Sequence, residues 1–227
     1  MLLGGNMQDQ LFTTFVRVLV IFTALPVHEF AHGFVADRLG DPTPRCQGRL
    51  TLNPFAHLDP MGSIALLLFG FGWAKPVSID ARNFKKPKWG MALSSLAGPG
   101  ANVLMSFIAL VCFKLLLAFE GSFDPRFYRA AAGLGSVLSL VISINLYLAV
   151  FNLLPIPPLD GSRIFSAVLP SKLYWSLMRY ERVIYVILIL LMMTGILSIP
   201  LRILSGYILD LLNWLTLPLD LLVGRLR

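Results

Sequence analysis

The sequence predicts an all-α polytopic membrane protein, and three observations lead to that fold class. Hydrophobic residues make up 56% of the 227 positions, whereas a soluble domain has roughly 45–50%. Charged residues make up 14%, against about 25% in soluble domains. Several apolar stretches also approach or exceed the roughly 20 residues that a helix needs to cross a bilayer. A soluble domain of this length could not bury so much apolar surface.

Long apolar stretches predict the three core helices, over residues 11–36, 91–118 and 133–154. The stretch 62–74 is apolar but too short to span as a helix, and it fits a re-entrant or interfacial segment. Residues 183–201 are uncharged and predict another helix. Residues 203–224 carry Asp210 and Asp220, so this segment either spans the bilayer or lies at its interface.

We expect a single membrane domain over residues 1–227, with a core over about 11–165 and C-terminal helices over about 166–227. The sequence contains no internal repeat and no low-complexity tract. The first ten residues carry no positive charge, and no small-residue cleavage site follows the first apolar run. We therefore expect the first helix to be retained and not removed as a signal peptide.

The net charge of +7 is explained by loops that face the cytoplasm. Eight basic residues lie in 37–90, four in 155–182 and two in 119–132. The positive-inside rule places the first two of these loops in the cytoplasm and the N-terminus outside, in a multi-pass protein of the cell membrane. If 203–224 spans the bilayer, the chain would end in the cytoplasm. No basic and aromatic motif accompanies the charge, so nucleic acid is excluded as a partner.

The strongest chemical signal is the sequence HEFAH at residues 28–32, an H-E-x-x-H motif. In a helix His28 and His32 lie on one face, where two imidazoles can hold a zinc ion with Glu29 beside it. A charge at the centre of a spanning helix costs at least ~2.5–3.5 kcal/mol. That cost favours a functional metal site over the alternative, an inert wet turn at the interface.

A hydrolytic zinc site uses three protein ligands and leaves a fourth position for water. The candidates for the third ligand are His57, Asp59 and Asp160. We favour Asp160 because the prolines within 155–158 end the 133–154 helix just before it. Backbone groups freed at membrane depth are tolerated only inside protein or beside a wet cavity. The alternative for Asp160 is an ordinary helix cap.

These two motifs together resemble the site-2 protease family of intramembrane zinc metalloproteases. The resemblance rests on H-E-x-x-H in a first long helix and N-x-x-P-x-P-x-L-D-G at residues 152–161. Three shorter matches support it: GWAKPV at 72–77, NPFAHLDPMG at 53–62 and AGPGAN at 97–102. The chain is similar to the minimal prokaryotic form, because we find no stretch long enough for a PDZ domain and no CBS domain after residue 165.

The resemblance implies an intramembrane zinc endopeptidase that cuts in or near a transmembrane helix of a membrane-protein substrate. It implies one Zn²⁺ ion per chain, with His28, His32 and Asp160 as ligands. Glu29 would be the general base that activates the metal-bound water, and Asn152 would contact the substrate backbone or the tetrahedral intermediate. A short membrane-associated hairpin over 62–80 would lie near the site and could pair with an unwound substrate by strand addition.

Two further polar residues are candidates for binding the substrate or supporting the metal ligands. Asn102 follows the sequence Gly98-Pro-Gly100. It could orient a substrate or make a polar contact between helices. His57 lies in a loop and could be a transient or inhibitory fourth ligand, or a turn residue close to the ligands.

Two other classes of function remain open at this point, a metal carrier or sensor and a catalytically silent membrane scaffold. Glu29 discriminates between them and the protease, because a carrier needs no base beside its ligands and a scaffold needs no buried ionisable set. The expected partners are a transmembrane substrate and the lipid bilayer, and a homo-oligomer stays open.

Overall fold

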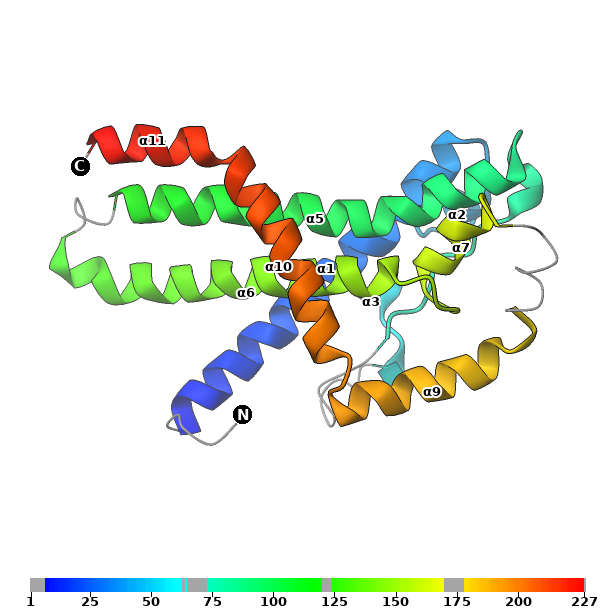
Figure 1. The fold of residues 1–227 in the computed structure, drawn as a ribbon, viewed down its shortest axis with the longest axis horizontal. Helices are drawn as coiled ribbons and strands as arrows, with labels where there is room; N and C mark the ends of the chain where they lie inside the picture. The colour runs from blue at the N-terminus through cyan, green and yellow to red at the C-terminus, as the bar shows by residue number, and fades with distance from the viewer. Residues whose placement is uncertain (1–6, 63, 65–72, 120–123, 170–177, 227) are drawn as a thin grey trace.

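The computed structural model describes residues 7–62, 64, 73–119, 124–169 and 178–226, and these are mostly helical (Figure 1). Three of the described helices are long and apolar enough to cross a membrane, over Thr14–Arg38, Pro87–Phe119 and Pro125–Leu153. No strand occurs in the described ranges, where Leu58 and Ala74 form an isolated antiparallel bridge. The expected all-α membrane fold is confirmed.

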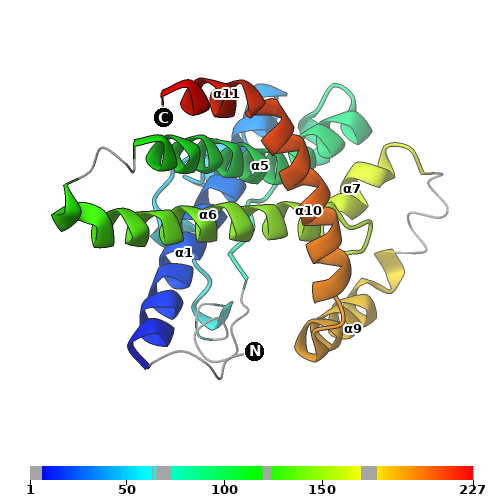
Figure 2. The same cartoon turned by 60° about the vertical axis from the view of Figure 1, so that its left-hand side comes forward.

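The three expected core helices are α1, α5 and α6, with bounds Met7–Arg38, Pro87–Phe119 and Tyr128–Leu153. A single 3-10 turn, η3 (Pro125–Phe127), leads into α6. The central helix α5 packs against both α1 and α6, so the three form one bundle (Figures 1 and 2). In a bilayer the backbone must satisfy its own hydrogen bonds, which explains why these long apolar stretches fold as helices.

The apolar centre of the bundle lies between α5 and α6 and is closed by the C-terminal part of the chain. Its buried side chains are Ala109 and Leu110 of α5, Ile142 and Leu146 of α6, and Leu212. Helices in lipid associate through close van der Waals packing and hydrogen bonds between them, because lipid tails are as apolar as the side chains. This packing holds α5 and α6 together.

Helix α6 ends at Leu153, and a turn of six residues leads to the short helix α7 (Asp160–Ser166). The chain turns so sharply there that a Cβ on Gly161 would overlap the carbonyl oxygens of Leu153 and Leu154. Only glycine fits this close approach of backbone to backbone. The turn therefore places Asp160 at the first position of α7, beside the end of α6.

Short elements connect α1 to α5, namely α2 (Thr43–Cys46), α3 (Pro54–His57) and η1 (Ala81–Asn83). The buried Asp41 carboxylate joins α2 to η1. It accepts hydrogen bonds from Thr43 N and Oγ1 (3.1 and 2.6 Å), Asp80 N (2.8 Å) and Asn83 Nδ2 (2.7 Å). Burial alone would raise the pKa of Asp41, but these donors outweigh it and hold the pKa below its usual range. The connection is thereby fixed to the end of α1.

Residues 73–77 of this connection are extended and bond to both α3 and α1. Lys75 N donates to His57 O (2.7 Å), next to the Leu58–Ala74 bridge. Two residues further on, Val77 N donates to Glu29 Oε2 of α1 (2.9 Å). Of the hairpin expected over 62–80, residues 63 and 65–72 lie outside the described residues, so the hairpin itself stays a prediction.

The C-terminal part forms three helices, α9 (Glu181–Thr194), α10 (Ser198–Leu215) and α11 (Leu217–Leu226). The uncharged stretch 183–201 is thus not one helix, because Gly195 adopts a left-handed φ of 72° and ends α9. The segment 203–224 is not one helix either, since α10 stops at Leu215 before Thr216.

The last helix lies at the end of the bundle that is opposite the 37–90 connection. Lys114 Nζ of α5 and Asp220 Oδ2 of α11 are 2.6 Å apart. Figures 1 and 2 show α11 beside the C-terminal half of α5, at the same end as the start of α1. The sequence leaves open whether 203–224 spans the bilayer, and in the structure this stretch is divided between α10 and α11.

The path of α10 and α11 predicts on which side of the membrane each of three inserted tags should lie. Tags at the N-terminus and after Arg227 should lie on one side, and a tag inserted after Gln47 should lie on the other. The measurement is detection of each tag by a membrane-impermeant reagent before and after permeabilisation. A C-terminal tag on the same side as the Gln47 tag would contradict the path of α10 and α11.

Candidate metal centre

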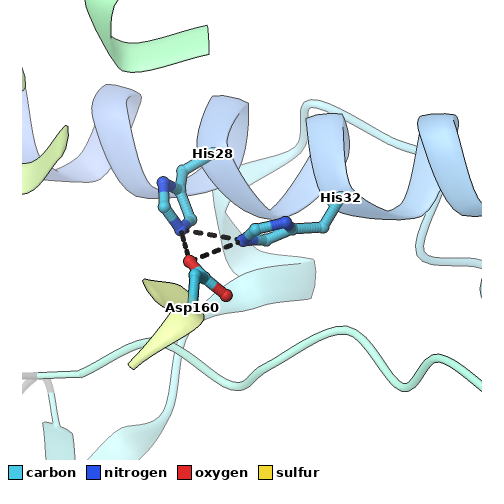
Figure 3. A group of neighbouring side chains, drawn as sticks. All are labelled: His28, His32 and Asp160. Atoms are coloured by element: carbon cyan, nitrogen blue, oxygen red, sulfur yellow. Dashed lines mark hydrogen bonds and ion pairs between the residues drawn. The ribbon is translucent and has the colours of Figure 1, made fainter. Parts of the chain in front are cut away.

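Three side chains from two distant parts of the sequence converge near one end of the bundle. Figure 3 shows His28 and His32 of α1 pointing toward Asp160 of α7. The two Nε2 atoms are 2.9 Å apart, and each lies 3.1 Å from Asp160 Oδ2. The helical spacing of four residues brings the imidazoles together, as the sequence predicts, and the Leu-Asp-Gly turn supplies the carboxylate.

The outer nitrogens of both imidazoles face groups that accept hydrogen bonds. His28 Nδ1 lies 2.6 Å from Asn102 Oδ1, and His32 Nδ1 lies 2.7 Å from the carbonyl oxygen of Ser94. Because an amide or carbonyl oxygen cannot donate, each Nδ1 must carry the proton. In the neutral imidazoles both Nε2 atoms then have a free lone pair, which is the form that binds metals.

Three lone pairs that converge in this way require a positive charge among them. The two histidines are 4% and 6% exposed, so water cannot relieve the repulsion. A cation bound between them is the natural counterpart of two neutral imidazoles and a carboxylate placed in this way.

The donor set fits a zinc ion. Two imidazole nitrogens and one carboxylate oxygen are ligands that zinc takes at about 2.0–2.2 Å. Ligand atoms of a tetrahedral site with such bonds are about 3.3 Å apart, close to the separations of 2.9–3.1 Å found here. Among the described residues, these three form the group of histidine, cysteine and acidic side chains that could hold a metal.

A glycine in α5 allows the imidazoles to lie directly against that helix. A Cβ on Gly98 would overlap the His32 ring and lie 2.7 Å from Cε1 of His28. Any side chain at this position would displace the two ligands. By contrast, a Cβ on Gly100 of the same helix would meet no atom within 4 Å. The Ala-Gly-Pro-Gly sequence thus has one glycine that the site requires and one that it does not.

Glu29 lies beside the three convergent atoms but is not one of them. Its Oε2 accepts the hydrogen bond from Val77 N, which ties the carboxylate to the extended segment 73–77. Both Glu29 and the three candidate ligands line a cavity of about 460 Å³. Its other walls come from segment 73–79, the ends of α6 and α7, and one face of α9. The cavity is large enough to admit a stretch of peptide.

The structure separates the remaining candidates. Asn152 lines the same cavity, and its Nδ2 donates to Leu148 O (2.9 Å). Asn102 touches a candidate ligand directly. His57 does not join the cluster, because it is buried on α3 with Nε2 2.8 Å from Thr51 O. Asp59 does not join it either, and its Oδ1 accepts from Gly62 N (2.8 Å).

Two backbone groups complete the surroundings of the site, and no pattern in the sequence points to them. The carbonyl of Ser94 fixes one imidazole and the amide of Val77 fixes Glu29. Every residue has such groups, so only the folded chain reveals which of them are used. Asn145 of α6 was also missed, although an asparagine inside an otherwise apolar span is costly and is a signal in itself.

Comparison with known proteins agrees with this geometry. The sequence model of peptidase family M50 matches residues 16–195. YwhC of Bacillus subtilis is 40% identical over 177 residues, which cover 78% of this chain and 80% of YwhC. Rip2 of Mycobacterium tuberculosis is 33% identical over 169 residues, 70% of this chain and 60% of Rip2.

A more distant relative is MJ0392 of Methanocaldococcus jannaschii, 28% identical over 158 residues, 69% of this chain and 35% of MJ0392. The names of all three relatives contain the words zinc metalloprotease. No solved structure matches the chain. With a family match over most of its length and a convergent set of metal-binding side chains between apolar helices, the chain belongs to peptidase family M50, the site-2 proteases, and is a membrane-embedded zinc metalloprotease.

Proposed function

We propose that this protein is an intramembrane endopeptidase that hydrolyses a peptide bond in or near a transmembrane helix of another protein. The observation that carries the proposal is the convergence of three lone pairs beside Glu29, in a cavity enclosed by apolar helices. Two of the ligands lie on α1, which is long and apolar enough to cross a membrane, and this supports a site at membrane depth. Its substrates must therefore reach the site within or close to the bilayer.

We assign His28, His32 and Asp160 as the ligands of one zinc ion per chain. Zinc, when bound, supplies a water of lowered pKa and polarises the carbonyl that is attacked. Two neutral imidazoles and one carboxylate would hold the ion, and all three residues line the cavity. Asn102 and the Ser94 carbonyl keep both imidazoles in the binding tautomer.

Glu29 is assigned as the general base. It lies in the cavity wall with one carboxylate oxygen held by Val77 N at 2.9 Å, so its position is fixed before a substrate arrives. A carboxylate placed there can take a proton from the attacking water and pass it to the leaving amine. The same residue argues against a metal carrier and a silent scaffold, because neither requires an anchored base beside the ligands.

A helical substrate must unwind locally before it can be cut, because its carbonyls are occupied in bonds along the helix. Segment 73–77 runs past the site in extended form, and an unwound substrate could pair with it as an added strand. Asn152, in the cavity wall, is placed to contact such a strand. We therefore expect helix-breaking residues near the cut to favour cleavage.

The loop 37–90 and its basic residues are assigned to the cytoplasm of the cell, which places the N-terminus outside. His28 lies ten residues before Arg38, the end of α1, a distance of about 15 Å at 1.5 Å per residue. Water then enters the site from the cytoplasmic side, and the cleaved fragment leaves on that side.

Adding a methyl group at Gly98 should remove the metal site. Gly98→Ala should bind zinc at least about ten-fold more weakly than the wild type, because its Cβ would displace both imidazoles. Gly100→Ala is the matched control and should bind zinc like the wild type. The measurement is zinc affinity of detergent-purified protein by competition with a chromophoric chelator. Equal affinities for the two variants would refute the placement of the histidines against α5.

Removing the charge of Glu29 should separate binding from catalysis. Glu29→Gln keeps an oxygen for Val77 N but cannot take a proton, so the cleavage rate should fall at least about 100-fold. Its zinc content should match that of the wild type. The substrate is a synthetic transmembrane helix with a Gly-Pro break at its centre and a fluorophore at each end, in proteoliposomes.

The control for this variant is Glu181→Gln, which changes another carboxylate that lines the cavity. It should cleave the same peptide at nearly the wild-type rate. Undiminished cleavage by Glu29→Gln would exclude Glu29 as the base. A cleavage-dead Glu181→Gln would move the base to α9.

A further inference from the structure

Three buried polar side chains, one from each core helix, form a continuous hydrogen-bonded row that ends at the metal centre. They are His28 of α1, Asn102 of α5 and Asn145 of α6, which are 4%, 0% and 1% exposed. Asn102 Nδ2 donates to Asn145 Oδ1 at 2.8 Å, and Asn145 Nδ2 donates to Val141 O at 2.9 Å. A buried amide without hydrogen-bond partners is costly. A row of buried amides among apolar helices is therefore a candidate for a functional role.

The row has a direction, because it starts at a group that can only accept. The carbonyl of Val141 requires the NH₂ of Asn145 to face it, which turns Asn145 Oδ1 toward Asn102. That oxygen requires the NH₂ of Asn102, which turns Asn102 Oδ1 toward His28. An amide oxygen 2.6 Å from His28 Nδ1 requires the proton on that nitrogen. Each orientation follows from the one before it.

We propose that Asn145 is a positioning residue that sets the tautomer of His28 through Asn102 and thereby sets the affinity for zinc. This inference rests on the proposed metal site. With Asn145 in place, Asn102 has one stable orientation, and the lone pair of His28 Nε2 faces His32 and Asp160. Without it, the Asn102 amide can flip and present its NH₂ to Nδ1. The proton then belongs on Nε2, where it blocks the metal.

The second histidine needs no such support. His32 Nδ1 bonds to the backbone carbonyl of Ser94, which cannot flip because it belongs to a helix. Only His28 depends on two rotatable amides for its tautomer. Asn145 does not touch the convergent ligand atoms, so its effect on zinc must pass through Asn102. Groups that orient metal-bound histidines typically change metal affinity 10- to 100-fold when they are removed.

The test is the zinc affinity of detergent-purified variants, measured by chelator competition. Asn145→Leu removes the acceptor that holds Asn102 and should weaken zinc binding at least about ten-fold. Asn145→Asp should stay within about three-fold of the wild type, because a buried carboxyl favours its neutral form. A neutral carboxyl donates to Val141 O and accepts from Asn102, as the amide does. Rescue by this variant is an outcome that a general loss of packing does not produce.

Ser106→Ala is the matched control for packing. Ser106 is fully buried, and its Oγ donates to Ile142 O at 3.1 Å. Its removal therefore takes away another buried hydrogen bond between α5 and α6 without touching the row. It should bind zinc within about three-fold of the wild type. If Asn145→Leu does not fold, Asn145→Ser serves instead, since a serine there is too short to reach Asn102.

The outcomes separate this inference from the proposed metal site. Wild-type zinc affinity in Asn145→Leu or Asn145→Ser overturns the role of Asn145 and leaves the zinc site intact. Equal weakening in Ser106→Ala and Asn145→Leu also overturns it, because the effect is then one of packing. Failure of the wild-type chain to bind zinc at all overturns the proposed metal site itself.

Discussion

The core of this protein depends on one electrostatic constraint: two imidazole lone pairs and a carboxylate oxygen meet at 2.9–3.1 Å in a buried site. Such a set is unstable without a positive charge among its members. The other features of the core serve to create it. The long helix α1 carries both histidines, the Leu-Asp-Gly turn returns a carboxylate to them, and Gly98 lets α5 lie flat against their rings.

The same constraint links the metal to the rest of the chemistry. The candidate ligands on α1 and α7 line a cavity whose other walls include the extended segment 73–77 and α9. Val77 N then fixes Glu29 at the edge of the site. The Glu29 carboxylate, the candidate metal ligands and an extended edge thereby lie at one cavity, an arrangement that suits the proposed hydrolysis of an unwound peptide. The hydrogen-bonded row from His28 through Asn102 to Asn145 connects the candidate metal centre to α6.

Much of this could be predicted from the sequence, because the relevant signals are local. The apolar stretches predicted α1, α5 and α6, and the spacing of His28 and His32 predicted a shared face. Asp160 was favoured over His57 and Asp59 from the prolines before it, and the structure brings Asp160 alone to the histidines. The helix breaks at Gly195 and Thr216, the Ser94 carbonyl and the Val77 amide were missed. They depend on tertiary contacts and on backbone groups that every residue shares.

The most direct measurement of the central claim is the zinc content per chain of detergent-purified wild type, Asp160→Asn and Asp59→Asn. We expect close to one zinc ion in the wild type and in Asp59→Asn, and a marked loss in Asp160→Asn. That result would join the two sequence motifs in one metal site. Equal zinc in the wild type and Asp160→Asn, or a loss confined to Asp59→Asn, would contradict it.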